Sequence, residues 1–316
     1  MSNSEVNTVG IIGTGLIGGT WAAYFLSRGL SIRAWDPATN ARSHLDQVVS
    51  SALTDLRALR GDSIDLTGDL IFCDTLADAV TGSDYIQENG PEKLDLKQSL
   101  IAEIDRHAAP HVIIGSSTSS LKATDLQVRC RHPERVLVAH PFNPSHLLPL
   151  VELVRGAKTS EAVQNAAAEF FERIGKVPVR VQKEVVGHVA NRMAAALWRE
   201  AVHIVAEGIA SVEDVDRSIR FGPGLRWAIY GPHMLYHLGG GDGGIRGYLE
   251  HLGPAQEARW QELGSPRLTE PVKEKIISGI EEEAAGKSVT ELRNRRDRLL
   301  VELLKLLNND SQEMSR

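Results

Sequence analysis

Three short polar segments contain residue types that could move a proton during a reaction. The first is the hydroxyl-rich run Ser116-Ser117-Thr118-Ser119-Ser120. The second is Ala139-His140-Pro141-Phe142-Asn143-Pro144, in which two prolines restrict the loop after the histidine. The third is Pro149-Leu150-Val151-Glu152-Leu153-Val154, in which a carboxylate lies among apolar residues and therefore needs a partner.

These segments predict a general base and the groups that support it. An imidazole whose far nitrogen is held by a carboxylate is a competent base near neutral pH. A short chain reversal would place His140 beside Glu152, and Ser119 could then donate a hydrogen bond to a substrate oxygen. Taken separately, the hydroxyl run also fits a helix-capping turn, and His140 fits a structural histidine.

A glycine-rich loop near the N-terminus predicts a dinucleotide site. Gly13-Thr14-Gly15-Leu16-Ile17-Gly18 follows the short apolar strand predicted for residues 9–12 and opens a helical segment. In such a loop the first glycine permits a tight turn and the second lets the backbone approach a pyrophosphate. The third lets helix and strand pack closely. The unpaired N–H groups at the helix N-terminus can then bind the phosphates.

The residue after the second predicted strand indicates which dinucleotide binds. Asp36 follows residues 31–35 and stands about 20 residues after the loop, as the full fingerprint requires. Its carboxylate would bind the adenosine ribose hydroxyls and repel a 2′-phosphate, so NAD is favoured over NADP. Arg42 is nearby in sequence, and we interpret it as a surface residue.

Alternating strands and helices are expected to position these groups. Apolar segments predict strands at residues 9–12, 31–35, 69–73, 84–87, 112–115, 136–139 and 150–153, with helices at about 17–28, 40–59 and 92–107. A last helix and strand occupy residues 160–181. The alternation is typical of a mainly parallel sheet covered on both faces, whose ligands collect at the carboxyl ends of the strands. We therefore expect an α/β domain with a Rossmann-type doubly wound sheet.

The pattern changes after Lys183. Apolar residues then recur at three- and four-residue steps and predict a helix with one apolar stripe, formed by Val186, Val189, Met193, Leu197, Ala201 and Ile204. More helical segments follow, and no strands alternate with them. We expect an NAD-binding domain over residues 1–184 and an all-helical C-terminal domain over residues 185–316.

Composition excludes several classes of protein. Of 316 residues, 42% are hydrophobic and 24% charged, and the net charge of −6 without a basic stripe argues against a nucleic-acid partner. No apolar run approaches a membrane span, and the N-terminus does not resemble a signal peptide, so we expect a cytoplasmic protein. Cys73 and Cys130 are expected to be reduced. No metal site is expected, because Pro110 interrupts the helical spacing of His107 and His111.

Together these segments resemble the 3-hydroxyacyl-CoA dehydrogenase superfamily over nearly the whole chain. The resemblance is carried by the glycine loop, the hydroxyl run at residues 117–120, the His140-Pro141-Phe142-Asn143-Pro144 segment, Glu152, and Gly187 with Asn191-Arg192. It implies that His140 is the base and that Glu152 orients it. It also implies that Ser119 and Asn191 bind the substrate oxygen, and that two chains join through their helical domains.

The same resemblance implies a set of cofactor contacts. Glu92, Lys97 and Asn143 match positions near the nicotinamide half of the dinucleotide. They complete the expected NAD site with the loop residues and the acid after the second strand: Gly13, Thr14, Gly15, Leu16, Ile17, Gly18 and Asp36.

Within the superfamily the chain looks most similar to the branch that holds L-carnitine dehydrogenase and lambda-crystallin, an L-gulonate 3-dehydrogenase. The shared motifs include Pro91-Glu92-Lys93-Leu94-Asp95-Leu96-Lys97 and Gly224-Leu225-Arg226-Trp227-Ala228. Residues 196–201 and 239–241 lean toward the carnitine enzymes. Relatives usually carry a glutamate where this chain has Met234, which leaves the substrate open.

The expected reaction is oxidation of the 3-hydroxyl of a small free 3-hydroxy acid to the 3-oxo acid. Hydride passes to the nicotinamide while His140 takes the hydroxyl proton. Residues 37–70 contain no lysine and only three arginines, so the phosphates of a CoA thioester would find little charge. L-carnitine is the leading substrate, with L-gulonate and 3-hydroxybutyryl-CoA as alternatives.

Aromatic residues are the reason for preferring carnitine, because a quaternary ammonium binds aromatic faces. Phe142, Trp227 and Tyr230 lie in segments expected at the cleft, although packing is an alternative role for all three. A non-catalytic crystallin-like role and an NAD-sensing module are the rival function classes. The presence of His140 and Glu152 argues against both.

Overall fold

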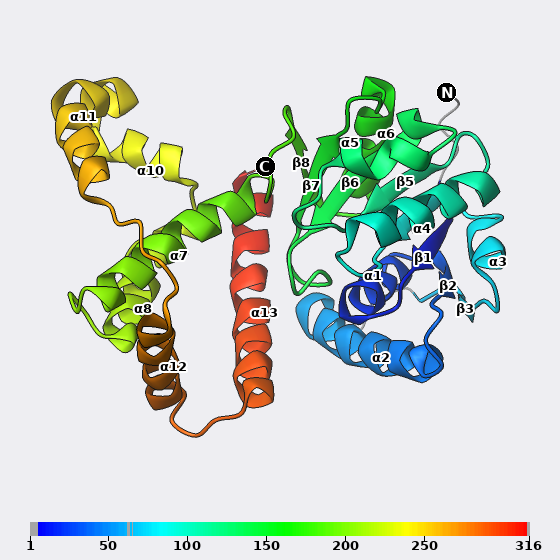
Figure 1. The fold of residues 1–316 in the computed structure, drawn as a ribbon, viewed down its shortest axis with the longest axis horizontal. Helices are drawn as coiled ribbons and strands as arrows, with labels where there is room; N and C mark the ends of the chain where they lie inside the picture. Colours follow the sequence, from blue (N-terminus) through cyan, green and yellow to red (C-terminus); the bar gives the residue numbers. More distant parts are fainter. Residues whose placement is uncertain (1–5, 62–63, 65, 315–316) are drawn as a thin grey trace. The chain divides into compact units, whose positions relative to one another are not determined.

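The computed structural model describes residues 6–61, 64 and 66–314, and the chain divides into two compact units. The first comprises Met1–Arg192 with Arg296–Asn308, and the second comprises Met193–Arg295 with Asn309–Arg316. Figure 1 shows the strands in the first unit and the helices of both. Within the described residues, no helix is long and apolar enough to cross a membrane.

One eight-stranded sheet forms the centre of the first unit, in the order β3-β2-β1-β4-β5-β6-β7-β8. Adjacent strands in this sheet are parallel, except for the antiparallel pair β6 and β7. The strand bounds agree with the predicted segments to within two residues: β1 Thr8–Ile12, β2 Ser31–Trp35, β3 Leu70–Phe72, β4 Tyr85–Glu88, β5 Ile113–Ser116, β6 Val136–Pro141, β7 Leu150–Arg155 and β8 Val177–Val181.

Helices cover both faces of this sheet (Figure 1). One core contains residues of α1, α2 and α6, and the other contains residues of α3, α4 and α5. Their bounds are α1 Leu16–Leu26, α2 Ala41–Arg60, α3 Leu76–Val80, α4 Leu94–His107, α5 Ala123–Leu126 and α6 Glu161–Arg173. In the first core Trp21 stacks on Phe25 at 5.0 Å, and both are buried. Burying each such side chain contributes about 1.5–3 kcal/mol. The predicted doubly wound α/β domain is confirmed.

Two helices begin later than the sequence pattern predicts. Helix α4 begins at Leu94 rather than residue 92, because Lys93 has an extended backbone. Helix α7, Ala190–Ala206, begins four residues after Val186, the first residue of the predicted apolar stripe. Gly187 and His188 have φ values of +77° and +51°, which a right-handed helix cannot contain.

The segment between β8 and α7 is bound to the first unit along its length. The Glu184 carboxylate accepts hydrogen bonds from the backbone and side chain of Thr124. Further along, His188 bonds to a carbonyl, and the N–H groups of Val189 and Ala190 bond to Glu152. These bonds explain why the compact unit extends to Arg192. The domain boundary at residue 184 stays a prediction.

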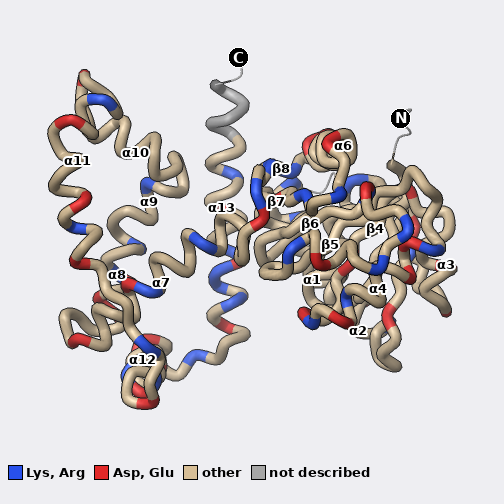
Figure 2. Tube along the Cα trace, turned by 45° about the horizontal axis from the view of Figure 1, so that its top comes forward, with Lys and Arg blue, Asp and Glu red and all other residues tan. Residues whose placement is uncertain are grey.

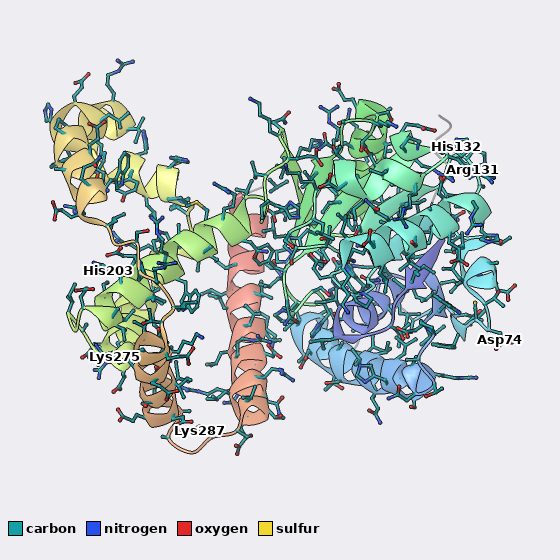
Figure 3. All side chains as sticks on the ribbon, in the orientation of Figure 1. Asp74, Arg131, His132, His203, Lys275 and Lys287 are labelled. Carbon is teal, nitrogen blue, oxygen red and sulfur yellow. The ribbon has the colours of Figure 1, made fainter. Side chains whose placement is uncertain are left out.

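The second unit consists of helices in the part that the structure describes. They are most of α7 and the two ends of α13, with α8 Val212–Phe221, α9 Pro223–Trp227, α10 Pro232–Gly239, α11 Gly244–Glu262 and α12 Glu270–Ala284. The α8 N-terminus is capped by the Ser211 side chain. Lys275 of α12 donates to the carbonyl of Ala206 at 2.9 Å, and Figure 3 labels this lysine.

Charges of both signs are spread over each unit rather than gathered by sign (Figure 2). The last helix, α13 Val289–Met314, contributes to both units. Its Val301 and Leu304 form a small core with Leu147 in the first unit. The C-terminal part of the chain therefore helps to complete the α/β unit.

Candidate active site

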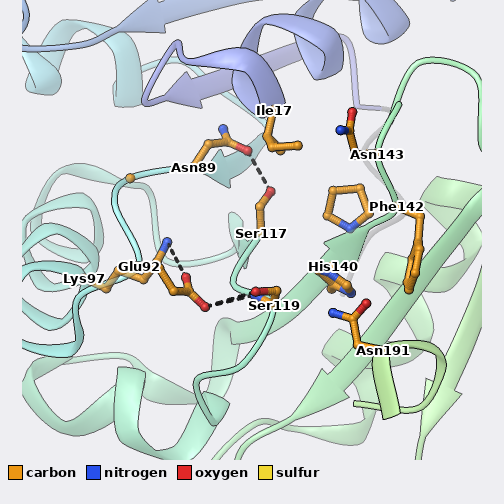
Figure 4. A pocket seen from close by; sticks show the side chains of 12 residues that line it. Ile17, Asn89, Glu92, Lys97, Ser117, Ser119, His140, Phe142, Asn143 and Asn191 are labelled. Atoms are coloured by element: carbon orange, nitrogen blue, oxygen red, sulfur yellow. Dashed lines mark hydrogen bonds and ion pairs between the residues drawn. The ribbon is translucent and has the colours of Figure 1, made fainter. Parts of the chain in front are cut away.

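A pocket opens where strands β1, β4, β5 and β6 end in the first unit. This is the point at which the strand order reverses direction, where open α/β sheets bind their ligands. The cavity measures about 470 Å³, and Figure 4 shows the side chains that line it. They are Ile17, Asn89, Gly90, Glu92, Lys97, Ser117, Ser119, His140, Pro141, Phe142, Asn143 and Asn191.

His140 and Glu152 form a buried pair, as the sequence predicts. They lie opposite each other in the antiparallel register of β6 and β7. His140 Nδ1 is 3.0 Å from Glu152 Oε2, and the two side chains are 7% and 1% exposed. Because Nδ1 bonds to the carboxylate, Nε2 is the nitrogen available to a substrate.

The second oxygen of Glu152 holds the start of α7. Its Oε1 accepts the backbone N–H groups of Val189 at 2.8 Å and Ala190 at 2.9 Å. Burial raises the pKa of Glu152, but the hydrogen bonds from His140 and from these two N–H groups have the larger effect. The pKa of Glu152 therefore lies below its ordinary value. The carboxylate is therefore charged at neutral pH, as a partner for imidazolium should be.

Ser119 and Asn191 line the same pocket as the histidine, and Figure 4 shows both side chains near His140. Ser119 lies in the loop after β5, and Asn191 is the second residue of α7. The Glu152 bonds to the preceding two N–H groups fix the helix turn that carries Asn191. The structure thus brings the four predicted catalytic residues together.

Glu92 shapes the hydroxyl-rich loop. Its Oε1 accepts hydrogen bonds from Thr118 Oγ1 at 2.6 Å, Ser119 N at 3.1 Å, and Ser120 N and Oγ at 3.1 and 2.9 Å. Burial raises the pKa of Glu92, but these donors and the charge of Lys97 lower it below its ordinary value. A negative charge therefore lies at the pocket.

A second buried ion pair was missed by the sequence analysis. Glu88 ends β4 and is fully buried, and its oxygens lie 2.8 and 3.0 Å from Lys97 Nζ. Ser116 Oγ and the Gly90 N–H also donate to it, at 2.5 and 2.6 Å. The local signal for Glu88 is weak, because it stands at a strand end after the polar Gln87, whereas Glu152 was selected as a carboxylate inside an apolar strand.

The pair changes what Lys97 does. The Lys97 side chain is 1% exposed, and its Nζ lies 2.8 Å from Glu88 and 3.8 Å from Glu92. The ammonium charge is therefore matched inside the protein. Lys97 fixes the end of β4 against α4 and lines the pocket beside Glu92.

The glycine loop has the geometry that a pyrophosphate needs. Gly13 has a φ of +89°, and a Cβ on Gly18 would meet the Gly13 carbonyl. A Cβ on Gly15 would meet no atom within 4 Å, so this position is open to a ligand. Thr14 Oγ1 is buried and has no partner among the described residues. These features fit a dinucleotide phosphate at the N-terminus of α1.

Asp36 organises this loop through two hydrogen bonds. Its Oδ2 accepts the Thr14 N–H at 2.8 Å, and its Oδ1 accepts the Ala38 N–H at 2.9 Å. Leu16 is exposed beside the loop, and Ile17 lines the pocket. Of the expected cofactor residues, Ile17, Glu92, Lys97 and Asn143 line the pocket, and the rest of the glycine loop with Asp36 lies outside its lining.

The remaining predicted residues divide between the units. Phe142 and Asn143 line the pocket, and the Phe142 ring lies 5.1 Å from the His140 ring. Trp227 and Tyr230 belong to the second unit, where both are exposed. Cys73 and Cys130 are free thiols. Among the described residues, no group of three or more His, Cys, Asp and Glu side chains is placed to hold a metal ion.

Comparison with known families matches the two parts of the chain separately. Residues 8–185 match the NAD binding domain of 3-hydroxyacyl-CoA dehydrogenase. Residues 187–274 match the C-terminal domain of the same family. The two matches together cover most of the chain.

Individual relatives extend over nearly the full length. The L-carnitine dehydrogenase of Oceanobacillus iheyensis is 45% identical over 304 residues, which are 95% of this chain and 98% of that protein. The L-carnitine dehydrogenase of Pseudomonas aeruginosa is 41% identical over 95% of this chain and 94% of its own. A solved 5-formyl-3-hydroxy-2-methylpyridine 4-carboxylic acid 5-dehydrogenase, an NAD⁺-dependent dismutase, has a TM-score of 0.83 at 29% identity, covering 96% of this chain and 99% of that one. The chain therefore belongs to the 3-hydroxyacyl-CoA dehydrogenase family and is an NAD-dependent oxidoreductase.

Proposed function

We propose that this enzyme oxidises the 3-hydroxyl group of L-carnitine, a small free 3-hydroxy acid, to the 3-oxo acid. The observation that carries the proposal is the buried His140–Glu152 pair at 3.0 Å, in the same pocket as Ser119 and Asn191. Relatives named L-carnitine dehydrogenase align with the chain from end to end and support the substrate.

The residues divide the work of the reaction. His140 Nε2 takes the proton of the substrate hydroxyl, and the charged Glu152 stabilises the imidazolium that forms. Ser119 and Asn191 hold the substrate oxygen. Residues 13–18 and Asp36 hold the phosphates and the adenosine ribose of NAD, while Glu92, Lys97 and Asn143 lie toward the nicotinamide. NAD supplies the hydride acceptor when it is bound.

The charge and shape of the pocket favour a cationic substrate. The Glu92 carboxylate and the Phe142 ring both line the pocket, and the ring lies beside His140. A quaternary ammonium is attracted by both kinds of group. We also assign Trp227 and Tyr230 to substrate binding, because they are exposed aromatic residues.

The small number of basic residues in α2 favours a free acid over a CoA thioester as the substrate. Arg60 is the last residue of α2, and its guanidinium donates to Ser27 Oγ at 3.0 Å and lies 5.2 Å from the Tyr24 ring. It is therefore already engaged inside the unit. Arg42 and Arg57 alone would leave a triply phosphorylated handle with little charge to bind.

The test is NAD reduction by the purified enzyme with L-carnitine, L-gulonate, 3-hydroxybutyrate and 3-hydroxybutyryl-CoA. We expect the highest kcat/KM with L-carnitine. A higher value with the CoA thioester would contradict the free-acid assignment, and a higher value with L-gulonate would contradict the substrate alone. Failure of all four would contradict the proposed activity.

We also propose that the enzyme is a cytoplasmic homodimer joined through the helical unit. Five apolar side chains of this unit are 57–64% exposed in the single chain: Phe221, Leu225, Ile229, Leu238 and Leu249. Exposed apolar surface of this extent is typical of an interface. The free thiols support a reducing compartment. Light scattering at micromolar concentration should give twice the chain mass, and a monomer mass would contradict the dimer.

A further inference from the structure

His188 is a second histidine beside the catalytic pair, and the proposed mechanism does not use it. It is 1% exposed, and its ring centroid lies 5.2 Å from that of His140 at an angle of 53°. Phe142 lies 5.1 Å from the same His140 ring. Two aromatic side chains therefore contact the base, and they restrict how its imidazole can turn about the bond to Glu152.

The hydrogen bond of His188 fixes its protonation. Its Nε2 lies 3.1 Å from the carbonyl oxygen of Thr118, which can only accept. Nε2 therefore carries the proton, and Nδ1 is the bare nitrogen of the neutral ring. Nδ1 is buried and has no partner among the described residues. Protonating it would place an unpaired N–H and a charge in the interior.

The bond from His188 reaches the peptide that carries Ser119. The Thr118 carbonyl and the Ser119 N–H belong to one peptide group, and Glu92 Oε1 accepts that N–H at 3.1 Å. The peptide is thus held at its oxygen by His188 and at its nitrogen by Glu92. Together the two bonds fix the orientation of this peptide, from which the Ser119 side chain projects.

The backbone of His188 is held in a strained conformation. Its φ is +51°, a value that residues other than glycine seldom adopt. The next two N–H groups bond to Glu152, and Asn191 follows directly. Such a conformation persists when surrounding contacts impose it, and these contacts are with the groups of the active site.

We propose that His188 is a positioning residue that joins the Ser119 loop to the His140–Glu152 pair. The inference rests on the proposed function, because it assigns a role within that same site. A single side chain sets two relations: the orientation of the base and the place of the hydroxyl that binds the substrate oxygen.

Neutrality of the ring suits this role. Burial lowers the pKa of His188, and the charge on His140 lowers it further, which outweighs the opposing effects of the Thr118 carbonyl, Glu152 and Glu92. These are the charged and titratable groups that act on it. A neutral neighbour adds no charge against the imidazolium that forms on His140.

Three substitutions separate the hydrogen bond from packing and strain. His188→Phe keeps a ring but loses the donor, and His188→Gln places an amide N–H near the position of Nε2. His188→Asn tolerates the left-handed backbone but is too short to reach Thr118. On the 3-hydroxy acid that the wild type oxidises best, we expect Phe and Asn to lower kcat about ten-fold, the effect of one lost hydrogen bond. We expect Gln to stay within about three-fold, and the Kd for NAD to stay unchanged in all three.

The decisive measurement is a double-mutant cycle with Ser119→Ala. If His188 acts through Ser119, then His188→Phe should lower kcat by less than about two-fold when Ser119 is already absent. Full additivity, or wild-type kcat in both the Phe and Asn variants, would overturn the inference. A wild-type enzyme that oxidises none of the acids would instead contradict the proposed function.

His146 provides a matched control. It is 5% exposed, has one side-chain partner in Asp55 at 3.1 Å, and its Nδ1 is also buried without a partner among the described residues. It does not line the pocket. His146→Phe should lower the melting temperature and leave kcat within about two-fold. A ten-fold fall in kcat for this variant too would show that any lost buried histidine bond slows the enzyme, and would overturn the specific role of His188.

Discussion

Two carboxylates of the same sheet are equally buried and accept similar numbers of hydrogen bonds, but one is paired with a lysine and the other with a histidine. Glu88 at the end of β4 accepts from a lysine, a serine hydroxyl and a backbone N–H. Glu152 in β7 accepts from a histidine and two backbone N–H groups. Both are about 1% exposed or less. The burial of a carboxylate and its number of hydrogen bonds therefore do not distinguish a catalytic pair from a structural one.

The cation makes the difference. A free histidine has a pKa of about 6.5 and a free lysine about 10.4, so at neutral pH only the histidine exchanges its proton readily. The imidazole of the Glu152 pair can take up a proton during turnover, whereas the ammonium of the Glu88 pair binds the carboxylate and fixes the pocket wall. The first pair should govern rate, and the second should govern stability.

The largest expected effect is loss of the base. His140→Gln should lower kcat by about 10²–10⁴, because general-base catalysis contributes that much. NAD binding should remain normal, because the glycine loop is untouched. Stopped-flow or steady-state rates with the best substrate provide the measurement, and near-full kcat with normal NAD binding would show that another residue takes the proton. Glu152→Gln should also slow the reaction, and the two losses should be strongly non-additive.

Breaking the lysine pair should affect stability first. Lys97→Met leaves Glu88 buried without its cation and should lower the free energy of unfolding by about 3–5 kcal/mol. The double variant Glu88→Gln with Lys97→Met should recover part of that loss. Urea denaturation of both proteins decides the matter. A loss below about 1 kcal/mol for Lys97→Met would remove the basis for calling the pair structural.

The wild type and a Glu152→Gln variant should differ in how their free energies of unfolding depend on acid pH. Because the folded pKa of Glu152 is depressed, this residue stabilises the fold above its unfolded pKa of about 4.3, and the contribution is lost as the pH falls through the folded value. Glu152→Gln removes the titrating group. Its unfolding free energy, measured by denaturation between about pH 5 and pH 3, should therefore fall less steeply than that of the wild type. Parallel pH curves would contradict the depressed pKa.

The smallest effect concerns a third carboxylate, Asp36, which is only half-buried and accepts from two backbone N–H groups. Asp36→Ala should weaken NAD and remove the repulsion of a 2′-phosphate, so the preference in kcat/KM for NAD over NADP should narrow. Asp36→Asn is the control, since it keeps an acceptor for the Thr14 N–H. Equal use of both cofactors by the wild type would contradict the role given to Asp36.

Sequence reasoning found the parts of the site that local patterns encode. The glycine spacing, the acid after the second strand and the isolated Glu152 each have a local physical signature. The strand periods then place His140 opposite Glu152 once a short reversal is assumed, and β6 and β7 pair in that way. The mainly parallel sheet and its helical layers follow from the alternation of strands and helices, whereas the strand order comes from the structure.

The residues that were missed depend on contacts between distant segments. Lys97 was interpreted as a cofactor residue, because nothing near it in sequence indicates that Glu88 takes up its charge. His188 lies between Val186 and Val189, the first two residues of the predicted apolar stripe. Only the Thr118 and Glu152 contacts show why the helix begins later, at Ala190.

The anchored segment at residues 182–190 has a consequence for engineering chimeras between relatives. A junction placed near residue 184, where the sequence texture changes, would exchange His188 and Asn191 along with the helices. The loop from the second parent would then have to donate its N–H groups to Glu152 of the first parent, although the two did not evolve together. A junction after Arg192 keeps the whole reaction centre on one parent, and residues 296–308 should come from the same parent because they belong to the first unit. Recombination at that point is the route by which new substrate ranges could be grafted onto an intact proton-transfer site.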